Sequence, residues 1–308
     1  MTKEILSSIY DYTLDELKEK LKPSFRAKQV YNWLYKKYAN SYDDMKNLPK
    51  ELIEDLKANY PIDILKVVKK EQSSDGSIKY LFKLRDNHTI EAVLLLMKDK
   101  KIDEDGQIVR SEKYTVCISS QVGCKVGCSF CLTAKGGFVR NLTVGEYIAQ
   151  IVHIKRDNEI AENKALNIVY MGMGEPLDNF DNFVKAVEIF SELDGLAISR
   201  RRQTVSTSGI ASKIKKLGIK DLQIQLAISL HAVDDELRSE LIPMNKAYNI
   251  ASIIEAVKAF PVDTRKKVMF EYLVIKDKND SLDAAKKLVK LLDGIQAKVN
   301  LIYFNPYP

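Results

Sequence analysis

The sequence predicts an α/β protein whose main domain is a sheet of parallel strands. From residue 113 onward, short strand-like runs alternate with helix-like stretches of roughly ten to twenty residues. This alternation is typical of parallel strands joined by right-handed crossovers. Small, polar or metal-binding residues follow successive runs, and the carboxyl ends of parallel strands commonly form a site. The runs are KYTVCIS (113–119), LNIVYM (166–171), RQTVST (202–207), QLAISL (225–230), VMFEYLVI (268–275) and KVNLIYF (298–304).

The helix-like stretches between these runs carry clear start signals. Thr143 with Glu146 forms a capping box, and the helix that follows is expected to turn Ile148, Ile151 and Val152 inward. Ser281 starts another helix, whose apolar face is expected to comprise Ala285, Leu288, Val289 and Leu292. Periodicity alone leaves two arrangements open, in which the helices cover one face of a curved sheet or both faces of an open one.

Residues 1–62 are predicted to form a small helical domain. Thr13 with Glu16 caps a first helix that ends by Pro23, a second spans roughly 24–38, and a third occupies PKELIEDLKANY. The aromatic residues of 25–38 are interpreted as its core. The lysines at 28, 36 and 37, together with the arginines at 200–202, are expected to contact the phosphates of a nucleic-acid partner. Reversing the three lysines to glutamate should then weaken the binding and flatten its salt dependence.

Residues 63–112 are predicted to form a β-hairpin and a linker. The hairpin turns at Asp86 and Asn87, and residues 99–112 are polar and charge-rich. Glu91 is a carboxylate within the apolar stretch TIEAVLLL. Two interpretations remain open for it, a proton acceptor in a functional site or an exposed position on an edge strand.

Composition sets the broad class of the protein. The chain has 308 residues, 45% of them hydrophobic and 29% charged, with a net charge of +6. It contains no run of eighteen apolar residues and no signal-peptide core, so we expect a cytoplasmic protein without a membrane span. The mild basic excess is compatible with a nucleic-acid partner but does not establish one.

Three of the four cysteines lie close together. Cys124, Cys128 and Cys131 form C-x3-C-x2-C, and Cys117 lies seven residues upstream. Four cysteines within fifteen residues could form a structural zinc site, but zinc sites usually present two separated short pairs. Thiolates at short spacing in a loop are the usual ligands of an iron–sulfur cluster. Three ligands on a four-iron cluster would leave one iron open to a substrate or cofactor.

These features resemble the radical S-adenosylmethionine (SAM) superfamily, and further motifs resemble its RlmN family. The resemblance rests on CISSQVGCKVGCSFC, YMGMGEPLDNFDN, RRQTVSTSG, AISLHAVDDELRSELIPMNKAYNI and VNLIYFNPYP, with RAKQVYNWLYKK and LPKELIEDL near the N-terminus. It implies a partial (β/α)6 barrel with an N-terminal helical accessory domain. It also implies methylation of adenosine C2 in 23S rRNA and in certain tRNAs, with a [4Fe–4S] cluster and SAM as cofactors. We expect a monomer that receives its electron from a reducing electron-transfer protein.

The resemblance also implies a role for each matching residue. Cys124, Cys128 and Cys131 would bind the cluster, Glu91 would be a proton acceptor, and Cys117 would assist proton loss from C2 and resolve a protein–RNA adduct by forming a disulfide. One SAM molecule would methylate a protein cysteine, and another would supply the radical that activates this methyl group. The expected SAM contacts are Gly174, Glu175, Ser206, Ser229, Leu230, His231 and Asn305.

The cysteine count raises a question about the radical-SAM core, 113–308. Chemistry of the RlmN type needs a fifth cysteine to carry the methyl group, and this sequence has four. The resemblance places the carrier beyond VNLIYFNPYP, so we expect a core truncated at its C-terminal end, which cleaves SAM slowly and leaves RNA unmethylated. Three other functions remain open: methylation at adenosine C8, RNA binding by an iron–sulfur protein without catalysis, and a zinc-bound structural module.

Overall fold

The structure is a computed structural model that describes residues 7–98, 101–102, 108–110, 112–162, 164–262 and 266–304. Its centre is a nine-stranded mixed sheet in the order β1-β2-β3-β6-β9-β10-β11-β12-β13. Six strands run parallel, and all six predicted runs are confirmed: β6 (Lys113–Cys117), β9 (Leu166–Tyr170), β10 (Gln203–Thr207), β11 (Gln225–Ser229), β12 (Val268–Val274) and β13 (Ala297–Tyr303). The described strands form no closed barrel, because β1 and β13 are the two edges of the sheet.

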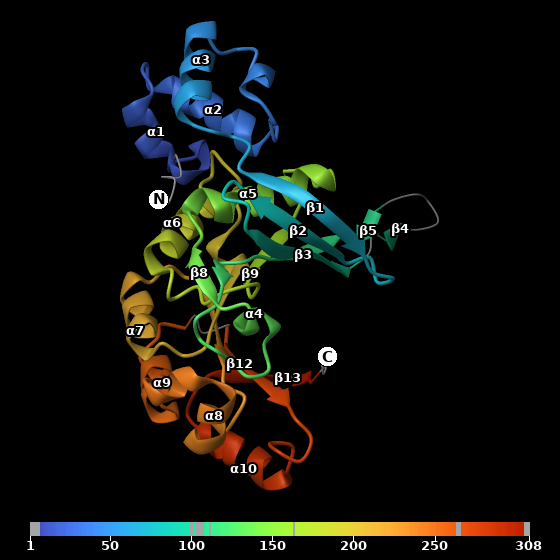
Figure 1. Ribbon diagram of the computed structural model, residues 1–308, viewed down its shortest axis with the longest axis vertical. Helices are drawn as coiled ribbons and strands as arrows, with labels where there is room; N and C mark the ends of the chain where they lie inside the picture. The colour runs from blue at the N-terminus through green and yellow to red at the C-terminus, as the bar shows by residue number, and fades with distance from the viewer. Residues whose placement is uncertain are drawn as a thin grey trace.

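The crossover helices follow one another along one side of the sheet (Figure 1). They are α5 (Val144–Asp157), α6 (Phe180–Ser191), α7 (Ala211–Lys220), α9 (Ile250–Lys258) and α10 (Leu282–Leu291), with α8 (Asp235–Leu241) after β11 and the short α4 (Leu132–Lys135) after the cysteines. Helices on one side leave side chains of the other face, such as Asn167 and Glu271, only partly buried. This is the arrangement of a partial barrel, as predicted.

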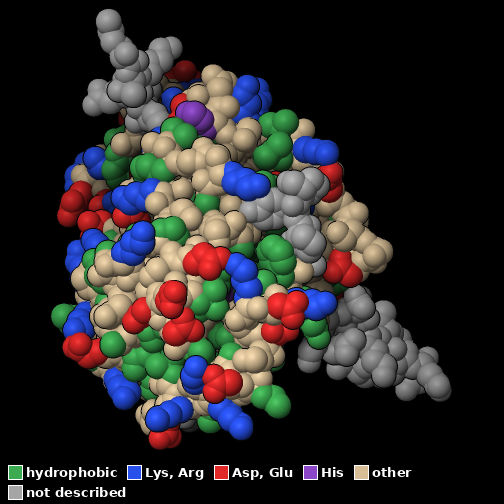
Figure 2. Space-filling view, turned by 60° about the horizontal axis from the view of Figure 1, so that its bottom comes forward, with side chains coloured by type: hydrophobic (Ala, Val, Ile, Leu, Met, Phe, Trp, Pro, Cys, Tyr) green, Lys and Arg blue, Asp and Glu red, His purple; other side chains and the backbone are tan. Residues whose placement is uncertain are grey.

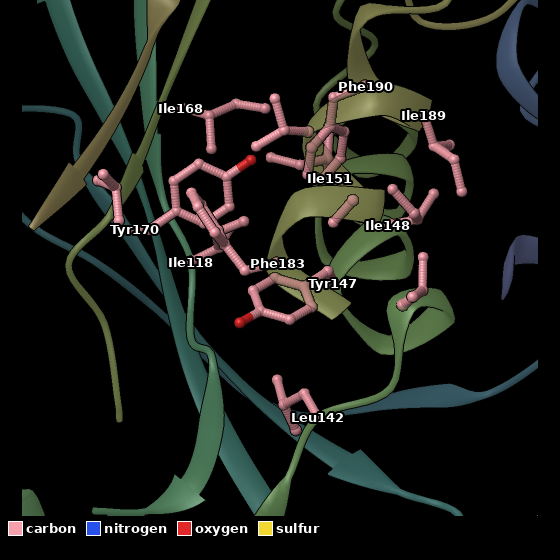
Figure 3. Close-up of a cluster of buried hydrophobic side chains, with 14 of the residues drawn as sticks. Ile118, Leu142, Tyr147, Ile148, Ile151, Ile168, Tyr170, Phe183, Ile189 and Phe190 are labelled. Atoms are coloured by element: carbon pink, nitrogen blue, oxygen red, sulfur yellow. The ribbon is translucent and has the colours of Figure 1, made fainter. Parts of the chain in front are cut away.

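The core lies between the sheet and helices α5 and α6. Ile148, Ile151 and Val152 are wholly buried, as the capping box at Thr143 predicts. Figure 3 shows Ile148 and Ile151 of α5 with Phe183 and other α6 side chains, facing Ile118, Ile168 and Tyr170 from the sheet. The apolar residues of 144–152 thus attach the first crossover helix to the strands that carry the site.

This packing predicts a large difference between two matched substitutions. Ile151→Ala should lower the free energy of unfolding by about 2–5 kcal/mol, because it leaves a cavity in a close-packed region. Val289→Ala on α10 should change it by less than about 0.5 kcal/mol, because Val289 is 75% exposed. Denaturant unfolding of both variants measures the two values, and equal losses would contradict this description of the core.

The predicted apolar face of α10 is partly wrong. Leu288 is buried, but Ala285 and Val289 are exposed, and the second buried position is Ala284. The apolar pattern of this helix is compatible with several rotations about the helix axis, each of which would bury a different set of residues. Only packing against the sheet decides which of its apolar residues are covered.

The N-terminal helices are close to those predicted. They are η1 (Ile9–Asp11), α1 (Leu14–Lys20), α2 (Phe25–Tyr35), η2 (Tyr42–Asp44) and α3 (Lys50–Asn59). The capping box is confirmed, because Glu16 N donates to Thr13 Oγ1 at 3.2 Å and Thr13 N donates to the Glu16 carboxylate at 2.8 Å. Tyr31 and Tyr35 are buried and Trp33 and Tyr38 pack against the core, as predicted, but Phe25 is 53% exposed and does not belong to it. The region docks on α5, where Gly145 N donates to Asp11 Oδ1 at 2.6 Å.

Two of the basic residues expected to contact RNA form ion pairs within the protein. Lys28 pairs with Asp194 at 3.0 Å and Lys36 with Glu162 at 3.7 Å, so both lysines join the helical region to acidic residues of the core. The Lys28 side chain is still 58% exposed, so its contact with phosphates stays a prediction. Arg200–Arg202 precede β10, at the opposite end of that strand from Ser206, and local sequence could not reveal this. Figure 2 shows acidic and basic side chains interspersed over one face.

The predicted hairpin is confirmed as β2 (Ile78–Leu84) and β3 (Thr89–Lys98), with Asn87 in the left-handed region at φ 71°. An additional strand, β1 (Leu65–Gln72), pairs with β2, and β3 pairs antiparallel with β6. The hairpin thus widens the main sheet. Arg140 connects its turn to α5, because this guanidinium contacts Asp86 at 2.6 Å and Glu146 at 2.7 Å.

Two further ribbons complete the described elements. They are β4 (Lys101–Ile102) with β5 (Ile108–Arg110), and β7 (Gln121–Gly123) with β8 (Phe138–Asn141). The stretch 99–112, predicted as a polar loop, therefore contains paired strands where it is described. In the part of the chain that the structure describes, no helix is long and apolar enough to cross a bilayer.

Candidate functional site

The carboxyl ends of the parallel strands surround a pocket of about 330 Å³. Its lining combines the three clustered cysteines, the turn after β9, and residues at the ends of β10, β11 and β12. The sequence predicted that these segments would meet at one rim, and they do. The lining residues among those predicted are Cys124, Cys128, Cys131, Gly174, Glu175, Ser206, Ser229 and His231.

The cysteine loop is held in place from both sides. On one side, Cys124 N donates to Gly137 O at 2.9 Å, next to the β7–β8 ribbon. On the other, Ser129 N donates to Leu241 O at 3.0 Å, and Val126 packs in a small apolar cluster with Leu241 and Ile242. The short helix α4 begins directly after Cys131. The loop therefore has a defined path before any ligand binds.

The three thiols are suited to binding an iron–sulfur cluster. Burial, with smaller contributions from the neighbouring thiolates, raises the pKa of Cys124 to about 11 and that of Cys128 to about 12. Such thiols resist ionisation unless a cation compensates, which a metal centre does. Among the described residues, no three His, Cys, Asp or Glu side chains are placed to surround a single ion. A four-iron cluster binds each thiolate through a different iron, so its ligands can lie farther apart.

The turn after β9 packs tightly against the exit of β6. Gly174 has φ +100°, and a Cβ at this position would lie 2.5 Å from the Cβ of Gln121 and 2.7 Å from its backbone nitrogen. No residue other than glycine fits without moving that backbone. The Gln121 side chain also accepts from Glu175 N at 2.9 Å, so the turn and the segment preceding the cysteines are held together.

Glu175 is a buried carboxylate within this pocket, only 3% exposed. Its oxygens accept from Ser208 N at 2.7 Å and Leu177 N at 3.0 Å. Burial raises its pKa, and these backbone donors oppose the rise. No Lys or Arg of the described chain forms an ion pair with it. A cationic group of a ligand would supply the missing partner, as the amino group of SAM would.

Two serines of the site share a carboxylate that the sequence reasoning missed. Ser206 Oγ donates to Glu271 Oε2 at 3.0 Å, and Ser229 Oγ donates to the same oxygen at 3.3 Å. Glu271 lies on β12 and lines the pocket. It occurs within the apolar run VMFEYLVI, so the signal that drew attention to Glu91, a carboxylate inside a strand, could have found it.

Ser208 was also missed, although the motif STSG contains it. It is 7% exposed and lines the pocket, and its Oγ is buried without a hydrogen-bond partner among the described residues. A buried hydroxyl without a partner is costly, so this atom fits a polar group of a bound ligand. The sequence offered no separate signal for it, because serine is common in turns.

His231 lines the pocket in a strained conformation with φ 58°. Its Nδ1 accepts from Leu273 N at 3.0 Å, so a neutral ring carries its proton on Nε2. Burial lowers the pKa of His231 to about 3, which keeps the ring neutral. The ring also packs edge-on against Phe130 of the cysteine loop, at 4.9 Å between centroids. Leu230 is buried beside it, and its contribution to the rim is its backbone.

The remaining predicted residues lie outside the pocket lining. Cys117 on β6 pairs with Val93 of β3, which places it on the same sheet face as Glu91, and burial raises its pKa to about 11. The Glu91 side chain is half-exposed and contacts Lys79 at 3.4 Å. Glu91 lies on an internal strand of the sheet, so the edge-strand interpretation is wrong. Asn305 lies outside the described residues.

Comparison with known proteins gives two matching family models. The Radical SAM superfamily matches residues 118–289, and the ribosomal RNA large subunit methyltransferase N-terminal domain matches residues 9–62. The second match ends where the predicted helical domain ends.

Similar whole proteins agree with these models. The chain is 92% identical over 308 residues to the dual-specificity RNA methyltransferase RlmN of Aliarcobacter butzleri, covering 100% of this chain and 86% of that protein. It is 66% identical over 301 residues to the protein of the same name from Sulfurimonas denitrificans, covering 98% and 85%. A crystal structure of a radical SAM methyltransferase from Sphaerobacter thermophilus aligns with TM-score 0.88 at 42% identity, covering 97% of this chain and 86% of that one.

Proposed function

The chain belongs to the RlmN family of dual-specificity, radical-SAM RNA methyltransferases, and from this premise we propose that its reaction is the methylation of adenosine C2 in 23S rRNA and in certain tRNAs. This reaction needs a cysteine to carry the methyl group in addition to the four of this sequence, so the 308 residues alone are expected to leave RNA unmethylated. The observation that carries the proposal is the single pocket at the carboxyl ends of the strands. It brings three cysteines of one loop together with a buried carboxylate and three strand ends at a single rim. A structural metal module or a plain RNA-binding protein has no need of such a pocket.

The residues of the pocket divide into two groups in this proposal. Cys124, Cys128 and Cys131 bind a [4Fe–4S] cluster, and the turn at Gly174 and Glu175 binds the amino group of SAM. Ser206, Ser229, His231 and the backbone of Leu230 form the wall on which the adenosyl part lies, with Asn305 as a further contact. When bound, the cluster and SAM supply the one-electron chemistry that an unactivated aromatic carbon requires.

Cys117 and Glu91 are proposed to act on the RNA base. They lie on the same face of the sheet, on neighbouring strands, and the base is proposed to lie over this face when it reaches the cofactor. Cys117 keeps its proton at neutral pH, since burial raises its pKa, so it needs a base before it can form a disulfide. Glu91 is proposed as the proton acceptor, and its half-exposed side chain contacts Lys79 at 3.4 Å.

The division of the chain into domains is also part of the proposal. Residues 1–62 form an accessory domain for RNA binding, 63–112 form the hairpin and linker, and 113–308 form the radical-SAM core. The electron comes from a reducing electron-transfer protein, and the enzyme acts as a monomer.

Nucleoside analysis of RNA tests the proposed reaction. RNA from cells that lack their own C2 methyltransferase but express the natural gene is digested and analysed by mass spectrometry. We expect 2-methyladenosine in 23S rRNA and in tRNA, and none when the gene encodes Cys128→Ala. Formation of 8-methyladenosine would establish the C8 reaction instead. Absence of both products, with the protein bound to RNA, would favour a binding protein.

The raised pKa of Glu175 predicts that SAM binding depends on pH. The buried carboxyl takes up its proton at a higher pH than an exposed glutamate would. Binding of the SAM amino group should therefore be complete above the raised pKa and be lost as the pH falls through it. Equilibrium dialysis of cluster-loaded protein between pH 8 and pH 5, with iron content followed in parallel, measures this. A constant affinity at constant iron content would contradict the role of Glu175.

The ion pairs of Lys28 and Lys36 change how RNA binding must be tested. Lys28→Glu removes a basic residue and also breaks the contact with Asp194. Weaker RNA binding by that variant could therefore come from the loss of a phosphate contact or from the loss of the ion pair. Lys28→Asp combined with Asp194→Lys restores the pair with its charges exchanged. If Lys28 contacts phosphate, the double variant should bind RNA more weakly, with a salt slope smaller by about 0.7–0.9. Wild-type binding by the double variant would assign Lys28 to domain docking alone.

A further inference from the structure

Arg238 on α8 is the largest fully buried side chain of the described chain, with 0% of its surface exposed. Its guanidinium donates to backbone carbonyls where two strands end: to Ser208 O at 2.5 Å, Ser229 O at 3.0 Å and Leu230 O at 3.1 Å. A fourth bond reaches Asn245 Oδ1 at 2.8 Å. The residue therefore joins α8 to the ends of β10 and β11, beside the pocket.

All four acceptors of Arg238 are neutral. Within the described residues, no carboxylate forms a hydrogen bond or ion pair with it. The nearest acidic group in this network is Asp235, which accepts from Asn245 Nδ2 at 3.0 Å and from Ile250 N at 2.9 Å. Arg140 shows the usual alternative, because Asp86 and Glu146 both contact its guanidinium. A buried cation without a paired anion is costly, so it is expected to have a function.

Arg238 lies beside the cysteine loop. Leu241 on the same helix belongs to the apolar cluster against which Cys128 packs, and Ser129 N donates to Leu241 O. Ser208 and Ser229, whose carbonyl groups accept from Arg238, line the same pocket as Cys128. Burial lowers the pKa of Arg238 only to about 10, so the guanidinium stays charged at neutral pH.

We propose that Arg238 is a positioning residue that supplies a buried positive charge to the iron–sulfur cluster and raises its reduction potential. The inference rests on the proposed function, because it requires the cluster. With three thiolate ligands the oxidised cluster carries one net negative charge, and reduction adds a second. A fixed cation in a low-dielectric surrounding stabilises the more negative state more strongly. One electron passes from the reductant to the cluster, and Arg238 neither gains nor loses a proton.

Redox titration of reconstituted protein with dithionite, followed by electron paramagnetic resonance, tests this. Arg238→Gln removes the charge and should lower the reduction equilibrium constant at least tenfold, which is about 59 mV for one electron. Arg238→Lys keeps the charge but loses the planar fork, and should retain a potential close to that of the wild type. Arg140→Gln is the matched control, since its charge is already neutralised, and it should leave the potential unchanged.

Each outcome decides the inference. An unchanged potential in Arg238→Gln, or equal shifts in the Gln and Lys variants, would mean that the residue only holds the loop and would overturn the proposal. If Arg238→Gln does not fold, Asn245→Asp combined with Asp235→Asn places a carboxylate against the guanidinium without setting two carboxylates side by side, and should lower the potential in the same direction. No shift in this double variant would also overturn the proposal. A wild-type protein that binds no cluster would refute the proposed function itself.

Discussion

Replacing any one of Cys124, Cys128 or Cys131 with alanine should abolish both the iron–sulfur cluster and SAM cleavage. Each thiol lines the same pocket, and a cluster held by three protein ligands cannot lose one and keep the geometry of the others. Iron and sulfide counting after anaerobic reconstitution measures the first loss. Chromatographic detection of 5′-deoxyadenosine after dithionite reduction measures the second.

Cys117→Ala is the control for this series. Cys117 lies on β6 outside the pocket lining, so its loss should leave both the iron content and SAM cleavage at the wild-type level. Loss of iron in Cys117→Ala would show instead that all four cysteines bind the metal. That result would favour a metal site closed by four thiolates, such as a structural zinc site.

Glu175→Gln should weaken SAM binding by about 30-fold to several thousand-fold. The carboxylate is buried, it has no cationic partner among the described side chains, and the amino group of SAM would provide one. Removing one charge of a buried pair costs about 2–5 kcal/mol, and every 1.4 kcal/mol is a factor of ten. Equilibrium dialysis of cluster-loaded protein gives the affinity.

The control substitution for Glu175 is Glu255→Gln on α9. Its side chain is 72% exposed and forms an ion pair with Lys215 on the surface. This variant should bind SAM like the wild type. Equal affinities of the wild type and Glu175→Gln, with unchanged cluster content, would show that Glu175 does not bind SAM.

Local sequence signals predicted most of the architecture. The six strands, the capping boxes at Thr13 and Thr143 and the turn at Asn87 depend on residues close in sequence, so pattern and spacing suffice to place them. The rim of the pocket followed from one further rule, that parallel strands end at the same edge. This is why the cysteines, Glu175 and the serines of β10 and β11 could be brought together before the structure was known.

The features that sequence reasoning missed depend on tertiary contacts. Whether Lys28 meets RNA or Asp194 depends on how the helical region docks. Glu271 had the same signal as Glu91, but only the register of β11 with β12 brings its carboxylate within hydrogen-bond distance of both Ser206 and Ser229. Arg238 lies among charged residues in DDELRSEL, a stretch typical of an exposed helix. Its burial depends on carbonyl groups from two distant strands.

The most direct test of the central claim is SAM cleavage by the reconstituted, reduced protein. Dithionite-reduced protein should convert SAM to 5′-deoxyadenosine and methionine in equal amounts. This conversion should be lost in Cys128→Ala and, at SAM concentrations that saturate the wild type, in Glu175→Gln. A protein that holds a full cluster yet forms no 5′-deoxyadenosine, or one that cleaves SAM equally well without Cys128, would contradict it.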